Sequence, residues 1–132
     1  MKYLILIHQN RSARAQFAAM PADVQASGMQ AYVDLNAALA ASGEYVSAEA
    51  LADDSTSTVV SMRSGSPVST DGPFAEAKEV VGGYSVLDVR SHEEAVEGAR
   101  RMMQIHLDHW PGWEGSCEVR RISGREEGPP TS

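Results

Sequence analysis

The sequence predicts an α+β sandwich, in which two helices cover one face of an antiparallel sheet. Short apolar runs typical of strands stand near both ends of the chain, two amphipathic segments lie between them, and no repeat or long linker interrupts the order. The predicted order is β-α-β-β-β-α-β over residues 1–122. This is the order of a ferredoxin-like fold with one additional strand.

Five runs predict the strands. The run YLILI at 3–7 is apolar on both strand faces, which is typical of a strand covered on both sides. The run VVGGYSVLDV at 80–89 is equally strong, although Gly82-Gly83 indicates a bulge or the close approach of a neighbouring backbone. Weaker runs predict further strands at 44–51, 57–63 and 116–122, with a turn at 64–67.

Capping signals delimit the two helices. Pro21 can open the first helix, and Gly43 supplies the left-handed residue that ends it. Ser91 and Glu94 form a capping box for the second helix, which should stop before Pro111. The first helix carries one apolar stripe at spacings of three and four residues, made of Met29, Tyr32, Leu35 and Leu39.

Two helices can cover only one face of the sheet. The first strand and the 80–89 strand are apolar on both faces, so the second face also needs a cover. Another copy of the same sheet is the most economical cover, and we therefore expect a symmetric homodimer.

Composition limits the partners. The 132 residues include 18 acidic and 11 basic side chains, for a net charge of -7, which argues against a nucleic-acid-binding protein. No window approaches the ~18 apolar residues of a membrane span, and no cleavage-site pattern follows MKYLILIH. We expect a cytoplasmic protein with one domain at 1–122 and a flexible tail at 123–132. Cys117, the single cysteine, excludes an intramolecular disulfide and should be buried or half-buried in its strand.

The stretch STDGPFAEAKE at 69–79 presents an acid in an unusual backbone setting. Pro73 fixes its own φ and pushes Gly72 out of the helical region, while Gly72 can adopt angles closed to other residues. Asp71 could simply bond backbone N–H groups of this turn. Alternatively, the stiff turn aims Asp71 into a pocket, and both interpretations stay open.

His8 is the second candidate residue. It ends the first strand on the face of Leu4 and Leu6, where alternation predicts an apolar residue. A partly buried histidine with structural hydrogen bonds is the simpler interpretation. The functional alternative pairs His8 with Asp71, because a carboxylate orients an imidazole for proton transfer.

The stretch HLDHWPGW at 106–113 allows two interpretations. His106 and His109 are three residues apart and share a helix face, but spacing places no third metal ligand. We therefore expect His106 to pack, His109 to interact with the negative helix end, and Trp110 and Trp113 to close the core or a dimer seam. The alternative is that this region walls a ligand pocket. We predict neither a metal nor a cofactor.

Three segments together resemble one family. MKYLILIH at the start, DGPFAEAKEVVGGYSVLDV in the middle and EVRRI near the end are similar to the YCII-related family in its DGPF-motif branch, over residues 1–122. The resemblance implies a ferredoxin-like fold that assembles as a dimeric α/β barrel. It also implies a cleft faced by a histidine at the end of the first strand and by the aspartate of the central motif, here His8 and Asp71.

The resemblance implies two functions of different classes. Relatives in the muconolactone-isomerase-like superfamily imply lyase or isomerase chemistry on an unknown small organic molecule, with His8 as general acid or base and Asp71 as its orienting partner. DGPF relatives encoded beside extracytoplasmic-function sigma factors imply instead a non-catalytic ligand-binding or protein-interaction module in transcriptional regulation. Whether the chain is an enzyme stays open on the sequence.

Overall fold

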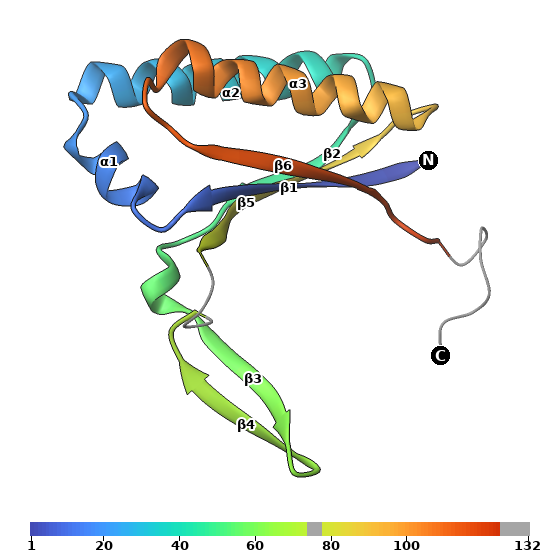
Figure 1. Cartoon of the computed structure of the whole chain (residues 1–132). Coiled ribbons are helices and arrows are strands. Elements are labelled where there is room, and N and C mark those ends of the chain that lie inside the picture. Colours follow the sequence, from blue (N-terminus) through green and yellow to red (C-terminus); the bar gives the residue numbers. More distant parts are fainter. Residues whose placement is uncertain (74–77, 125–132) are drawn as a thin grey trace.

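The computed structural model describes residues 1–73 and 78–124. A four-stranded sheet lies beneath two long helices (Figure 1). Its strands are, in spatial order, β2 (Tyr45–Ala50), β5 (Glu79–Asp88), β1 (Lys2–Asn10) and β6 (Gly115–Arg121), and all neighbours are antiparallel. The helices are α2 (Ala22–Ala41) and α3 (His92–His109). The predicted ferredoxin-like α+β class is confirmed.

Three elements were absent from the prediction, namely α1 (Ala13–Ala19), the 3₁₀ turn η1 (Asp54–Thr56) and β4 (Ser66–Asp71). The predicted strand at 57–63 is present as β3 (Thr58–Arg63), but it pairs with β4 in a separate two-stranded sheet. The turn predicted at 64–67 joins them through positive φ angles at Ser64 and Gly65. β4 escaped prediction because its residues, SPVSTD, are mostly polar and all exposed. Residues 125–132 of the predicted tail lie outside the described residues.

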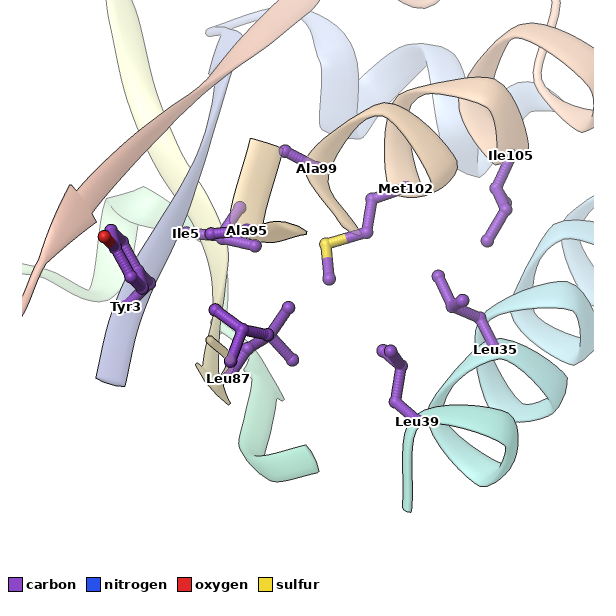
Figure 2. Packing of buried hydrophobic residues seen from close by; sticks show 10 residues of the cluster. Tyr3, Ile5, Leu35, Leu39, Leu87, Ala95, Ala99, Met102 and Ile105 are labelled. Atoms are coloured by element: carbon purple, nitrogen blue, oxygen red, sulfur yellow. The ribbon is translucent and has the colours of Figure 1, made fainter. Parts of the chain in front are cut away.

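Strand β1 lies in the middle of the sheet and divides its side chains between two faces. Tyr3, Ile5 and Ile7 are buried toward the helices, whereas Leu4 and Leu6 point to the other face and are half-buried. Figure 2 shows Ile5 within the resulting core. The remaining core side chains come from both long helices and from β5, and include Leu35, Leu39, Leu87, Ala95, Ala99, Met102 and Ile105.

The glycine pair in β5 meets both of its predicted roles. The register shifts between Ile7, which pairs with Gly83, and His8, which pairs with Val81, so Gly82 is the extra residue of a bulge. A Cβ on Gly83 would lie 3.0 Å from the carbonyl oxygen of Glu49, so the backbones of β2 and β5 approach closely there. A second register shift lies in β2, between Tyr45 and Ser47.

The helix ends follow their capping signals. Gly43 adopts a φ of 82° after α2, and the Ser91 Oγ accepts a hydrogen bond from the Glu94 N–H at the start of α3. The capping box is not reciprocal, because the Glu94 carboxylate accepts from the backbone and guanidinium of Arg90 instead. No helix in the described part of the chain is long and apolar enough to cross a membrane.

Trp110 fastens the end of α3 to the start of α2. Its indole N–H donates to the Val24 carbonyl oxygen over 3.2 Å, and its ring lies directly over Gly28. A Cβ built on Gly28 would lie 2.3 Å from the Trp110 Cε2 atom, a distance that the two groups cannot share. Glycine therefore occupies a mid-helix position, where it is normally unfavourable, so that the tryptophan can pack.

We predict that Gly28→Ala lowers the free energy of unfolding by about 1–3 kcal/mol, because the new methyl group forces the Trp110 ring away from the backbone of α2. The same change at a solvent-exposed helix position would raise stability by about 1 kcal/mol. Urea unfolding monitored by circular dichroism measures the difference. The matched control is the pair Gly28→Ala and Trp110→Leu, in which alanine should cost much less than it does beside the intact tryptophan. A stabilised Gly28→Ala single variant would contradict the packing described.

Candidate functional site

His8 lies near the end of β1 on the sheet face that the helices leave uncovered. Its neighbours across the strands are Val81 on β5 and Ser116 on β6, and Leu6 precedes it on the same face. The side chain is 28% exposed, so it is partly shielded but open to solvent and to a ligand. His8 thus shares a face with Leu4 and Leu6, as the alternation along the strand indicated, but β1 continues two residues beyond it to Asn10.

The carboxylate of Glu118 lies beside His8. Its Oε1 lies 3.7 Å from the His8 Nε2, and its Oε2 accepts a hydrogen bond from the Arg120 guanidinium. A separation of 3.7 Å is too long for a direct hydrogen bond but is within reach of one bridging water. The Glu118 side chain is 38% exposed, so the pair stabilises the fold little.

Asp71 lies elsewhere within the chain. It is the last residue of β4, is exposed, and pairs with Thr58 across the hairpin. Gly72 follows with a φ of 89°, as its backbone freedom predicted, and its N–H donates to the Ser57 carbonyl oxygen over 2.6 Å. Residues 74–77, whose N–H groups the turn-binding interpretation of Asp71 requires, lie outside the described residues.

No hydrogen bond or ion pair joins His8 to Asp71 among residues 1–73 and 78–124. The two residues belong to separate sheets, and the β3–β4 hairpin projects away from the sheet that carries His8 (Figure 1). Within one chain, the carboxylate beside His8 is therefore that of Glu118 and not that of Asp71. A site that contains both His8 and Asp71 stays a prediction.

Sequence reasoning did not identify Glu118. The alternation in SCEVRRI does carry the signal, because Cys117 and Val119 pack against the core while Glu118 points to the face of His8. The missing information was the pairing of β6 with β1, in which Leu6 lies opposite Glu118 and His8 lies opposite Ser116. Long-range pairing of this kind has no local signature.

Behind His8, two glycines make room for larger side chains. A Cβ on Gly82 would lie 2.7 Å from the Gln9 amide group, and a Cβ on Gly115 would lie 2.3 Å from both the His8 carbonyl oxygen and the Trp113 ring. The Trp113 indole N–H lies 3.4 Å from the Gln9 Oε1, which it contacts as a long hydrogen bond. The end of β1 is thus packed against both neighbouring strands, so the backbone that presents His8 is well fixed.

A second cluster forms where α3 ends against α2. His106 is 7% exposed, and its Nε2 lies 2.7 Å from the Tyr32 hydroxyl. The ring packs against Trp110 and Trp113, with a centroid separation of 3.9 Å from the latter. The prediction that His106 and Trp110 pack in the interior is confirmed.

The two histidines of HLDHWPGW have different partners. The His109 Nδ1 lies 2.5 Å from the Ser27 hydroxyl, while His106 contacts Tyr32. No group of three metal-ligating side chains occurs in the described part of the chain. The arrangement joins α3 to α2 through two hydroxyl contacts and gives no support to a metal centre.

Burial shifts the proton affinities of the second cluster. Desolvation lowers the pKa of His106 to about 4, because the charged imidazolium loses its hydration among aromatic rings. Desolvation also raises the pKa of Tyr32, with a smaller contribution from Cys117. The His106 Nδ1 is buried and has no hydrogen-bond partner among the described residues. His106 is therefore neutral at pH 7 and serves as a structural group.

The fold and this geometry define a class. The chain is a ferredoxin-like α+β protein with an imidazole on the uncovered face of its sheet. The model of the YCII-related domain matches residues 1–110, so the chain belongs to the YCII-related family. A comparison with curated proteins finds no match.

We predict that protonation of His106 destabilises the fold in acid. The folded-state pKa is about 4 and the unfolded value about 6.5, so the unfolded chain binds the proton more readily. The stability that neutral His106 provides is complete above pH 6.5 and is lost as the pH falls toward 4, by about 3 kcal/mol in total. Urea unfolding at pH 7, 5.5 and 4.5, at one protein concentration, measures this loss.

The non-titrating variant His106→Leu is the control. Its stability should fall less steeply than that of the parent between pH 6.5 and 4.5, whatever its stability at pH 7. His92→Leu, which removes an exposed histidine from the same helix, is the matched comparison. Parallel slopes for the parent and His106→Leu would show that His106 titrates normally.

Proposed function

We propose that this protein, as a member of the DGPF branch of its family, is a homodimer that catalyses lyase or isomerase chemistry on a small organic molecule, with His8 as general acid or base. The half-buried imidazole on an apolar, uncovered sheet face is the observation that carries the proposal. Imidazole both accepts and donates protons near neutral pH, which such reactions require.

The apolar surroundings of His8 support a small organic substrate. Leu4 and Leu6 precede His8 on its strand, and Tyr84 and Val86 lie opposite them on β5. This surface would bind the carbon skeleton of the substrate, while the imidazole, with Glu118 nearby, would accept or donate the proton. Asp71, in the role of orienting carboxylate, belongs to the same proposal.

A second copy of the chain would complete the cleft. A depression beside Gln9 and Val81 encloses only about 10 Å³, the room of one water molecule. A larger groove of about 730 Å³ lies at the other end of β5, beside Leu39 and Val89, and does not include His8. Pockets for small molecules are typically several hundred Å³. Walls from a partner would give the open face the depth that it lacks.

A second candidate function is a binding module for an extracytoplasmic-function sigma factor. The exposed apolar side chains of the hairpin favour a protein partner, since Val60 is 63% and Met62 is 71% exposed. This function requires neither His8 nor Asp71. Binding in a pull-down that survives the double change His8→Ala and Asp71→Ala would support it, whereas binding lost in that variant would argue for the site.

We predict that a thermal-shift screen of small organic acids and lactones yields compounds that raise the melting temperature by several degrees, because a ligand at 100 times its Kd adds about 2.7 kcal/mol. His8→Gln should abolish this shift, since the imidazole is the group proposed to bind the polar end of the ligand. His92→Gln, at an exposed position at the start of α3, should keep it.

Turnover of a compound found in this way tests the chemistry itself. Loss of proton exchange or elimination in His8→Gln, with binding only weakened, supports acid–base catalysis by His8. Undiminished turnover in this variant would exclude His8 as the acid or base. A shift equal in the parent and in His8→Gln would place the ligand elsewhere on the protein.

A further inference from the structure

The β3–β4 hairpin is an insertion that projects from the body of the protein. It leaves the chain between β2 and β5, which are neighbours in the four-stranded sheet, and it extends on the side opposite α2 and α3 (Figure 1). The uncovered sheet face lies on that same side. Isolated two-stranded hairpins are marginally stable in water, so a hairpin of this length is expected to pack against something.

The register of the hairpin separates its residues onto two faces. Residues directly opposite each other in an antiparallel pair share a face. One face, here called the arm face, carries the pairs Thr58 with Asp71, Val60 with Ser69, and Met62 with Pro67. The opposite face carries Val59 with Thr70, Ser61 with Val68, and Arg63 with Ser66. The arm face thus combines the two most exposed apolar side chains of the hairpin with Asp71.

The uncovered sheet face and the arm face can be compared with the area of a stable protein interface. Four strands at about 4.8 Å spacing and about 24 Å length cover roughly 450 Å², when the seven residues of β6 set the length. A stable interface buries about 800 Å² on each partner. That figure is accessible surface, which exceeds the flat outline of a face covered by side chains, and an arm from each copy, about 20 Å long, would add to the area that two stacked sheets bury.

The chemistry of the two surfaces also matches. The arm face is apolar and hydroxylic. The sheet face is apolar along its two central strands, where it presents Leu4, Leu6, Tyr84 and Val86, and it is charged along its outer strands, where it presents Glu49, Glu118 and Arg120. The hairpin segment 58–71 contains one Arg and one Asp, so it has no excess charge that would favour a nucleic acid or a charged membrane surface. A second copy of the chain supplies a sheet face with an apolar centre, formed by β1 and β5, on which the apolar side chains of the arm can pack.

We propose that the arm face packs on the uncovered sheet face of a second copy and brings Asp71 to the His8 of that copy. The inference rests on the homodimer of the proposed function. Because Asp71 shares a face with Val60 and Met62, its carboxylate points to the surface on which they pack. His8 lies on that surface in the partner. The two residues are therefore separate within one chain and meet between two.

Cysteine cross-linking tests this geometry without a known ligand. His8→Cys and Asp71→Cys are made separately in a Cys117→Ser background, mixed in equal amounts to exchange subunits, and treated with a short bis-maleimide. We expect a covalent dimer that approaches about half of the chains, the share of mixed pairs in a randomly exchanged dimer. Each variant treated alone sets the background.

Thr70→Cys is the matched control, because Thr70 precedes Asp71 but belongs to the opposite face of the hairpin. Its mixture with His8→Cys should cross-link at least fivefold less. If Asp71→Cys fails to fold, Ser69→Cys replaces it on the arm face. Sedimentation of Val60→Ser with Met62→Ser should show a dimer dissociation constant at least tenfold above that of the parent.

The outcomes distinguish failure of the proposed arm contact from failure of the proposed homodimer. A parent protein that sediments as a monomer at every concentration overturns the homodimer and, with it, the arm. A dimer in which His8→Cys does not link to Asp71→Cys, or links equally to Thr70→Cys, overturns the arm alone. A further variant carries both His8→Cys and Asp71→Cys on one chain. If it cross-links only within the chain and stays monomeric on a denaturing gel, the arm is also overturned.

Discussion

The alternation along β1 is the constraint on which the rest of the molecule depends. A central strand that is apolar on both faces must lose water from both, and the helices of residues 1–73 and 78–124 cover only one face. Tyr3, Ile5 and Ile7 satisfy that requirement within the chain. Leu4, Leu6 and His8 do not, and the proposed ligand, dimer and arm all concern this one remaining face.

Glycines and tryptophans connect this strand to the helical layer. Gly28 admits the ring of Trp110 and Gly115 admits the ring of Trp113, while Trp113 packs on His106 and approaches Gln9, the neighbour of His8. Large rigid side chains thus lie on bare backbone at places where any Cβ would collide with them. The Trp113 ring and its indole N–H link the end of α3 to the end of β1, and those of Trp110 link the end of α3 to α2.

The parts of the structure that follow from local chemistry could be predicted from the sequence. The strand at β1, the bulge at Gly82 and the stop of α3 before Pro111 each depend on residues within a few positions. The pairing of β6 with β1, which brings Glu118 to His8, depends on residues more than a hundred positions apart. The hairpin partner β4 lacks apolar alternation, which fits a strand whose six residues are all exposed. Asp71 was recognisable as unusual from its turn, but a turn specifies a backbone shape and not the surface that the carboxylate meets.

The register shift in β2 has a consequence for how copies of this chain can associate. β2 and β6 are the outer strands of the sheet, and an outer strand with free N–H and C=O groups invites another strand to add to it. The shift between Tyr45 and Ser47 breaks the even spacing of those groups in β2, while Glu118, Arg120 and Arg121 place charges along β6. Extension of the sheet from chain to chain, the route to fibrils, is disfavoured at both edges. Addition of strands at the sheet edges is thereby restricted. The proposed stacking of two sheets face to face differs from such addition, because it is complete once two copies have met.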